Sequence, residues 1–344
     1  MLQVDVGSPN DRIGNYRIEH ELGPTGAGIL LQAHHLVLPR RAIIKVVHSA
    51  FAGMQAFALQ TLREACILEA VAHPGVPVVY ESGVLRDRRP WFAFEAISGP
   101  TLEDVLAPGA LGIFEVAGLI RDLTDILEHA HRRGVIHRGL RPDRIVITAE
   151  RRYPLCIPDW SEAIAHDATT HAPPLASKGS RSYLAPELAQ QSATGPQDVV
   201  DDRVDMFALG VIAYRALTGR LPYGAVADCA PYAPAQQLRP DAPHELATLI
   251  DSLLAFDRFD RPSSSEVRTS IDWLLATLPA LQRRAAPDGE PQRTGSDSDA
   301  KQRISRLDQR RLRRPRWTPD VHYVEATDVD IRLAELDGSE VGTT

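Results

Sequence analysis

Apolar and polar residues follow two different spacings along this chain. Residues Tyr16–Leu22 alternate with a period of two, Arg41–Val47 is a run rich in β-branched residues, and Trp91–Ile97 is a third apolar run. Such stretches predict β-strands. After residue 101 the apolar positions recur every three or four residues, which predicts an amphipathic helix through Ile113, Val116, Ile120, Leu123, Leu127 and Ala130. The pattern therefore predicts an α+β protein with a β-rich first part and a helical second part.

A further helix is predicted between the second and third strands, where apolar residues recur at helical spacing at Phe57, Leu62, Cys66, Ile67 and Ala70. Lys45 lies within the second strand and Glu64 within this helix. A glycine-rich turn with Gly23, Gly26 and Gly28 follows the first strand. Taken singly, each feature has an ordinary explanation, because glycine-rich turns mostly reverse the chain and a strand lysine is usually an edge charge.

Two short stretches in the second half carry a more specific pattern. Residues 137–142 read His-Arg-Gly-Leu-Arg-Pro, and residues 158–161 read Pro-Asp-Trp-Ser. They resemble the catalytic loop and the metal-binding turn of the protein kinases, His-Arg-Asp-Leu-Lys-Pro and Asp-Phe-Gly. Residues 179–187, Gly-Ser-Arg-Ser-Tyr-Leu-Ala-Pro-Glu, resemble the pattern Gly-Thr-x-x-Tyr-x-Ala-Pro-Glu of bacterial Ser/Thr kinases. Asp205 and Arg261 match two positions with structural roles in the larger of the two lobes of a kinase.

The resemblance extends over residues 16–278 and implies an α+β, bilobal protein kinase-like fold, with a small β-rich N-lobe and a larger helical C-lobe. The chain would then divide into an N-terminal extension (1–15), a kinase-like N-lobe (16–98), a kinase-like C-lobe (99–283) and a disordered charged tail (284–344). The tail is predicted because a polar linker precedes a basic stretch and then an acidic one.

The resemblance also implies a site for ATP and Mg²⁺. Lys45 and Glu64 match the strand lysine and helix glutamate that form an ion pair and position the phosphates. Ile43 stands where the family usually has a small alanine, so its extra carbons are expected to crowd the adenine and weaken binding. Asp159 matches the carboxylate that holds Mg²⁺, and weakened metal binding is expected. The residues implied to bind the nucleotide are Gly23, Gly26, Gly28, Leu30, Ile43, Lys45, Glu64, Phe94, Glu95 and Ile97.

The groups that perform phosphoryl transfer in the family are replaced here. Gly139 stands at the position of the Asp that receives the proton of the substrate hydroxyl, and Arg144 stands at the position of the second metal ligand. Arginine presents only donors and stays charged, so it cannot ligate a cation. The neighbours His137 and Arg138 keep the pattern of the loop, Arg141 replaces its lysine, and none of the three supplies the base. Loss of a general base alone costs about 100- to 10,000-fold in rate.

The leading interpretation is therefore a pseudokinase that signals by binding a protein partner and, where the site permits, ATP. One alternative is a low-activity ATP-dependent Ser/Thr protein kinase, in which Lys45 and Asp159 hold MgATP and Arg144 substitutes for the charge of a second metal ion. Another is an interaction protein that works through the charged tail. An acidic side chain reaching into the space beside Gly139 would overturn the inactive interpretation.

Charge and hydropathy narrow the partners and the location. The net charge of -7 argues against nucleic acid as the main partner. The first ten residues lack the basic start and apolar core of a signal peptide, and the most apolar run, Met206–Leu217, is too short to cross a bilayer. We therefore predict a cytoplasmic protein with protein partners and no membrane association.

Overall fold

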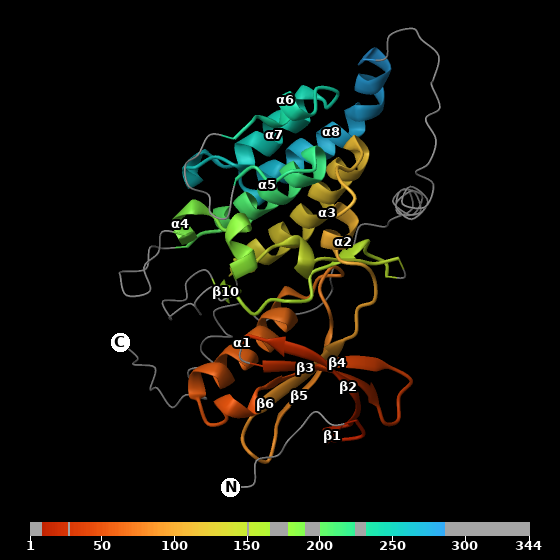
Figure 1. Cartoon of the computed structure of the whole chain (residues 1–344), viewed down its shortest axis with the longest axis vertical. Coiled ribbons are helices and arrows are strands. Elements are labelled where there is room, and N and C mark those ends of the chain that lie inside the picture. Colours follow the sequence, from red (N-terminus) through yellow and green to blue (C-terminus); the bar gives the residue numbers. More distant parts are fainter. Residues whose placement is uncertain are drawn as a thin grey trace.

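The N-lobe is built on a six-stranded antiparallel sheet, shown in red to orange in Figure 1. The computed structural model describes residues 9–26, 28–149, 151–165, 178–189, 200–223 and 232–285. The strands, in spatial order, are β1 (Arg12–Ile13), β2 (Tyr16–Thr25), β3 (Gly28–His35), β4 (Arg41–Val47), β6 (Pro90–Glu95) and β5 (Val79–Val84). Strand β1 lies before residue 16, in the predicted N-terminal extension, and pairs with β2.

Side chains from the two faces of this sheet enter two separate apolar clusters. Trp91 and Ile44 belong to a cluster within the N-lobe, whereas Phe92 and Phe94 belong to the large core that continues into the C-lobe. The alternation along β6 follows from the period of two in a strand. Helix α1 (Gln55–Val71) contacts β6 and adds its apolar residues to the large core.

Helix α1 ends at a residue with unusual backbone angles. Ala72 takes a left-handed conformation with φ of 42°, and its backbone N–H donates to the carbonyl of Leu68. Pro74 follows two residues later, and proline lacks the N–H that a continuing helix needs. The predicted helix therefore stops at this point, where the chain turns toward β5.

The C-lobe is a packed set of helices, shown in yellow to blue in Figure 1. Its helices are α2 (Leu102–Leu106), α3 (Ile113–His131), α4 (Pro186–Ala189), α5 (Arg203–Thr218), α6 (Ala235–Leu238), α7 (His244–Leu253) and α8 (Ser264–Ala285). Helix α3 is the amphipathic helix predicted from residues 113–130, and it packs against α5 and α8. Helix α5 buries apolar side chains around its whole circumference, which places it at the centre of the lobe.

Short two-stranded ladders hold the loop segments between the lobes. Strand β7 (Val135–Ile136) pairs with β10 (Ile164–Ala165), and β8 (Val146–Ile147) pairs with β9 (Leu155–Cys156). A one-turn 3₁₀ helix, Pro142–Arg144, lies between β7 and β8. These pairings bring the segment after β7 next to the segment between β9 and β10.

The linker between the lobes passes very close to β8. Gly99 has φ of 151°, and a Cβ atom on it would lie 2.0 Å from the carbonyl oxygen of Ile147. Only glycine fits this approach. Thr101 then caps the start of α2, where it forms a capping box with Asp104.

The predicted α+β bilobal kinase-like fold is confirmed. No helix among the described residues is long and apolar enough to cross a membrane. Nearly all of the predicted charged tail (284–344) lies outside the described residues.

Candidate active site

Lys45 and Glu64 form a buried ion pair between the sheet and α1. The Lys45 Nζ atom lies 2.6 Å from Glu64 Oε2, and the two residues are 6% and 4% exposed. Pairing of β4 with β3 and β6 places Lys45 between Leu30 and Phe92 in the ladder. Burial alone would lower the pKa of Lys45, but the carboxylates of Glu64 and Asp159 outweigh it and raise that pKa above its ordinary value. The lysine is therefore a fixed positive charge.

Asp159 lies close enough to act electrostatically on Lys45, in the turn that follows β9. Its Oδ1 atom accepts the backbone N–H of Ser161 at 3.1 Å, and its Oδ2 atom lies 3.1 Å from Arg144 Nε. Burial would raise the pKa of Asp159, but Lys45 and Arg144 hold it well below the ordinary range. The carboxylate is ionised, as a metal-binding group must be.

Arg144 connects two carboxylates in the centre of the site. Besides Asp159, its guanidinium contacts Glu162, with Nη1 3.0 Å from Oε1. Burial would lower the pKa of Arg144, but the two carboxylates raise it above the ordinary value. A permanent cation therefore stands at the position where the resemblance places the second metal ligand.

Glu162 occupies the space beside Gly139, and sequence reasoning missed it. A Cβ atom built on Gly139 would lie 2.9 Å from Glu162 Oε2 and 3.0 Å from Arg144 Nη1. Glu162 is only 6% exposed. It stands three residues after Asp159 in the sequence, and no motif spacing indicates that it turns toward residue 139. An acidic side chain beside Gly139 is the observation that we expected to overturn the inactive interpretation.

Asp205 on α5 fixes the backbone of the loop that contains His137 and Arg138. Asp205 accepts the backbone N–H of His137 at 2.8 Å and that of Arg138 at 2.7 Å. Arg138 has φ of 60°, a conformation that costs free energy in a non-glycine residue and persists because these contacts fix it. The Arg138 Nε–H also donates to the carbonyl of Glu162 at 3.0 Å. The loop and the turn that carries Glu162 are therefore joined directly.

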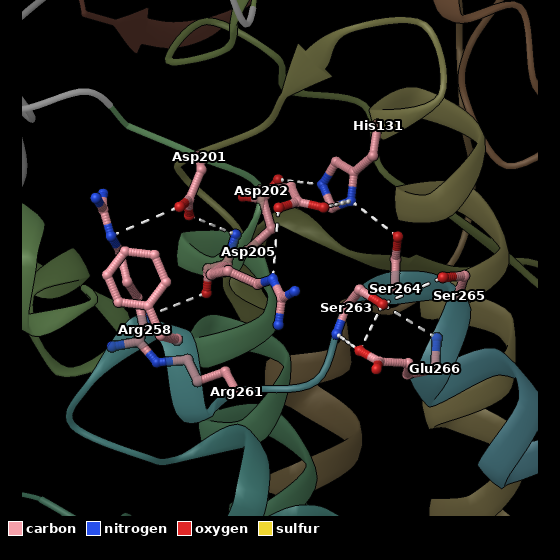
Figure 2. Close-up of polar contacts among 12 residues, drawn as sticks. His131, Asp201, Asp202, Asp205, Arg258, Arg261, Ser263, Ser264, Ser265 and Glu266 are labelled. Atoms are coloured by element: carbon pink, nitrogen blue, oxygen red, sulfur yellow. Dashed lines mark hydrogen bonds and ion pairs between the residues drawn. The ribbon is translucent and has the colours of Figure 1, made fainter.

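Figure 2 shows polar contacts around Asp205, among them those of His131 and Arg261. His131 Nε2 lies 2.9 Å from Asp205 Oδ2, and its Nδ1 lies 3.2 Å from Ser264 Oγ. Arg261 binds Glu187 through two hydrogen bonds of 2.6 and 2.9 Å and also donates to backbone carbonyls. We call Asp205, His131, Arg261 and Glu187 the support network. The polar side chains of all four residues are buried or partly buried.

The sequence profile of the protein kinase domain matches residues 16–273, which is more than half of the chain. The chain belongs to the protein kinase domain family. Serine/threonine-protein kinase pkn3 of Myxococcus xanthus is 29% identical over 301 residues, which cover 82% of this chain and 53% of that protein. Serine/threonine-protein kinase pkn2 of the same organism is 30% identical over a region that covers 61% of this chain and 25% of that protein. PrkC of Bacillus subtilis is 26% identical over a region that covers 75% of this chain and 41% of that protein. This chain thus spans about a quarter to about half of the length of these relatives.

Crystal structures share the fold of this kinase domain. The kinase domain of PknI from Mycobacterium tuberculosis matches with a TM-score of 0.58 and 24% identity, covering 77% of this chain and 98% of that one. At this level of identity the likeness supports the fold and nothing finer. The family as a whole uses ATP and Mg²⁺.

The residues present in this kinase domain fit one Mg²⁺ ion and not two. Asp159 offers ionised carboxylate oxygens, and Mg²⁺ is commonly held by one or two carboxylates together with substrate phosphates. Arg144 offers no lone pair, so it cannot replace the asparagine that holds a second ion in other kinases. Among the described residues no group of three or more His, Cys, Asp or Glu side chains could hold a metal.

The remaining residues that the resemblance assigns to the nucleotide lie on β2, β3, β4 and β6 of the kinase domain or in the segments that directly follow β2 and β6. Gly23 lies near the end of β2, Gly26 lies in the turn between β2 and β3, and Gly28 begins β3. The side chain of Ile43 is partly buried against the large core and pairs with Phe94 across the ladder. Glu95 lies at the end of β6, with its carboxylate 2.9 Å from Arg151 Nη2. Leu30 and Ile97 are likewise partly exposed, and the contacts of all these residues with a nucleotide stay a prediction.

Proposed function

We propose that this chain is an ATP-dependent Ser/Thr protein kinase domain of low activity. The observation that carries the proposal is the buried Lys45–Glu64 ion pair at 2.6 Å beside the ionised Asp159. Protein kinases require this ion pair and the metal-binding aspartate in place together. The support network holds the backbone of the catalytic loop in addition, so the framework for transfer is assembled.

The roles of the residues follow from their charges. Lys45 would bind phosphate oxygens of ATP, and Asp159 would hold a Mg²⁺ ion that neutralises developing charge on the phosphates. Arg144 adds a second positive charge where a kinase with the usual ligands would bind another metal ion. Phosphoryl transfer depends mainly on positioning and electrostatic stabilisation, so this arrangement supports transfer at a reduced rate.

Purified protein with ATP and Mg²⁺ provides the direct test. We expect phosphate to appear on Ser or Thr of the chain itself or of a generic protein substrate, detected by mass spectrometry. The Lys45→Ala variant is the matched control, because it removes the phosphate-binding charge at the described site. Equal phosphate incorporation by wild-type protein and this variant would reject the proposal.

A second candidate function is a pseudokinase that binds nucleotide and a protein without transfer. The observation that favours it is the Arg144–Asp159 ion pair, because a guanidinium occupies the carboxylate that would hold Mg²⁺. Under this candidate ATP raises the melting temperature equally with and without Mg²⁺, since a ligand selective for the folded state stabilises it. Under the kinase proposal the increase is larger with Mg²⁺.

The partner and the cellular location stay predictions from the sequence. A protein substrate or partner is the class that fits a protein kinase domain. A chain truncated after residue 285, compared with the full chain, tests whether the predicted tail is needed for capturing that partner. Loss of capture on truncation would favour the interpretation in which the tail is the working part.

A further inference from the structure

The geometry points to Glu162 as the residue that replaces the missing catalytic carboxylate: it accepts the proton of the Ser or Thr hydroxyl during transfer. This inference rests on the proposed kinase function and names a further catalytic residue for it. In the family the corresponding carboxylate is carried by residue 139 itself. Here the carboxylate comes from the turn after Asp159.

Position is the first argument. Glu162 Oε2 lies 2.9 Å from the point where the first side-chain atom of residue 139 would stand. The carboxylate oxygens of an aspartate lie two bonds beyond its own Cβ. Glu162 thus brings a carboxylate oxygen to nearly the distance at which an aspartate at position 139 would hold one.

The bonding of Glu162 is the second argument. Its Oε1 atom lies 3.0 Å from Arg144 Nη1, whereas Oε2 accepts no hydrogen bond from any residue that the structure describes. A buried carboxylate oxygen without a donor is rare in folded proteins, because the group keeps the cost of leaving water. The unpaired oxygen faces Gly139, where a hydroxyl group can supply the missing donor.

The backbone around Glu162 is the third argument, because a catalytic group needs a fixed position. The Glu162 carbonyl accepts the Arg138 Nε–H at 3.0 Å, and the next residue, Ala163, donates its N–H to the carbonyl of Trp160 at 3.0 Å. The Trp160 ring lies against His137, with ring centroids 4.6 Å apart. The turn is therefore attached to the same loop that Asp205 holds.

Arg144 controls access to the carboxylate. Glu162 Oε2 is enclosed beside Gly139 and Arg144, so a hydroxyl reaches it when the guanidinium turns toward the phosphates of bound ATP. A triphosphate carries more negative charge than one carboxylate, which favours that movement.

In the reaction the hydroxyl oxygen forms a bond to the γ-phosphorus while the bond from γ-phosphorus to the bridging oxygen breaks. ADP leaves with the electron pair, and the hydroxyl proton passes to Glu162 and then to water.

The Glu162→Gln variant tests the inference with little change in shape. We expect kcat to fall by about 100- to 10,000-fold, the usual contribution of a positioned base, while the Kd for ATP changes less than about twofold. Glu69, exposed on α1, supplies the control, and Glu69→Gln is expected to keep the wild-type kcat. Retention of wild-type kcat by Glu162→Gln, in protein whose transfer depends on Lys45, would overturn the inference and leave the kinase proposal intact.

A relocation experiment decides the matter even if Glu162→Gln folds poorly. Gly139→Asp alone places two carboxylates in contact, so we expect it to be less stable and no more active than wild type. Gly139→Asp combined with Glu162→Ala returns a single carboxylate to the loop, and we expect at least about tenfold more transfer than Glu162→Ala alone. Equal rates for these last two variants would contradict the inference. Absence of Lys45-dependent transfer in the wild-type protein would instead reject the kinase proposal and this inference together.

Discussion

The support network and the transfer centre of this kinase domain both contain buried charges, yet they differ in which residues supply those charges. The transfer centre is the group formed by Lys45, Glu64, Gly139, Arg144, Asp159 and Glu162. In the support network, Asp205, Arg261 and Glu187 keep the residue types that the family pattern predicts at their positions. In the transfer centre, Gly139 and Arg144 do not, and a carboxylate arrives from another segment.

The difference has a physical reason. Asp205 accepts two backbone N–H groups, and Arg261 donates two parallel hydrogen bonds to Glu187. Each of these contacts therefore requires a side chain with two polar atoms in a fixed geometry. The transfer centre needs mainly the right charges within a few ångströms of the phosphates. A residue at another position in the sequence can supply a charge, whereas a bidentate contact requires the particular side chain at its own position. Two of the three predictions below test whether the two regions respond differently to substitution, and the third concerns a buried histidine between the lobes.

The largest expected effect is on the support network. Asp205→Ala leaves two backbone donors and His131 without their acceptor in a buried place, and the strained Arg138 loses the contact that fixes it. We expect the free energy of unfolding to fall by about 3–5 kcal/mol, measured with urea. Asp202→Ala, which lies beside Asp205 but is partly exposed, is the control and should lose less than about 1 kcal/mol. A loss below 1 kcal/mol for Asp205→Ala would contradict the contrast between the two regions.

A second prediction concerns the junction of the lobes, where His129 on α3 meets the end of α1. His129 Nε2 lies 2.8 Å from the carbonyl of Val71, and burial, followed by nearby positive charges, lowers the pKa of His129 to about 4. The unfolded chain binds a proton near pH 6.5, so stability is full above that pH and falls as the pH drops from about 6.5 to about 4. The loss from this group reaches up to about 3 kcal/mol.

His129→Gln removes the titrating ring and keeps an amide that can donate to Val71. Unfolding measured at a series of pH values should therefore show a smaller loss of stability between pH 6.5 and 4 for this variant than for wild type. His244→Gln, on the exposed start of α7, is the control and should leave the pH dependence unchanged. Identical pH dependences for wild type and His129→Gln would show that the buried ring does not resist protonation.

The smallest effect on stability is expected in the transfer centre. Arg144→Asn restores the residue that binds a second metal ion in other kinases, and it removes the cation between Asp159 and Glu162. We expect a loss of about 1–3 kcal/mol without metal, because two carboxylates then lack their partner, and recovery of part of this loss on adding Mg²⁺. The transfer rate should gain a steeper dependence on Mg²⁺ concentration. An unchanged metal dependence would count against Arg144 as a substitute for metal charge.

The sequence predicts the support network better than the transfer centre. Lys45, Glu64, Asp159, Asp205 and Arg261 match motifs of the protein kinases, so the resemblance predicts their places in the fold. The Thr101 cap of α2 depends only on residues three positions apart. Strand β1 was missed because two residues carry no period, and the sheet includes them only through pairing with β2.

Glu162 shows why the centre is harder to predict. It stands next to Gly139 only because β7 and β10 pair and bring two segments together that are more than twenty residues apart. Whether a glutamate at this place points toward the loop or toward solvent depends on Arg144 and Arg138, which contact it from another segment. The absence of the family's aspartate was visible in the sequence, whereas the carboxylate beside Gly139 was visible only in three dimensions.

The measurement that tests the account most directly is the rate of phosphate transfer from ATP by the wild-type chain, relative to Lys45→Ala, at saturating Mg²⁺. We predict that the wild-type rate exceeds the variant's by at least about tenfold, since the buried Lys45–Glu64 pair and Asp159 would be positioned for transfer. Equal rates for the two proteins, when thermal unfolding curves show that both are folded, would contradict the kinase proposal.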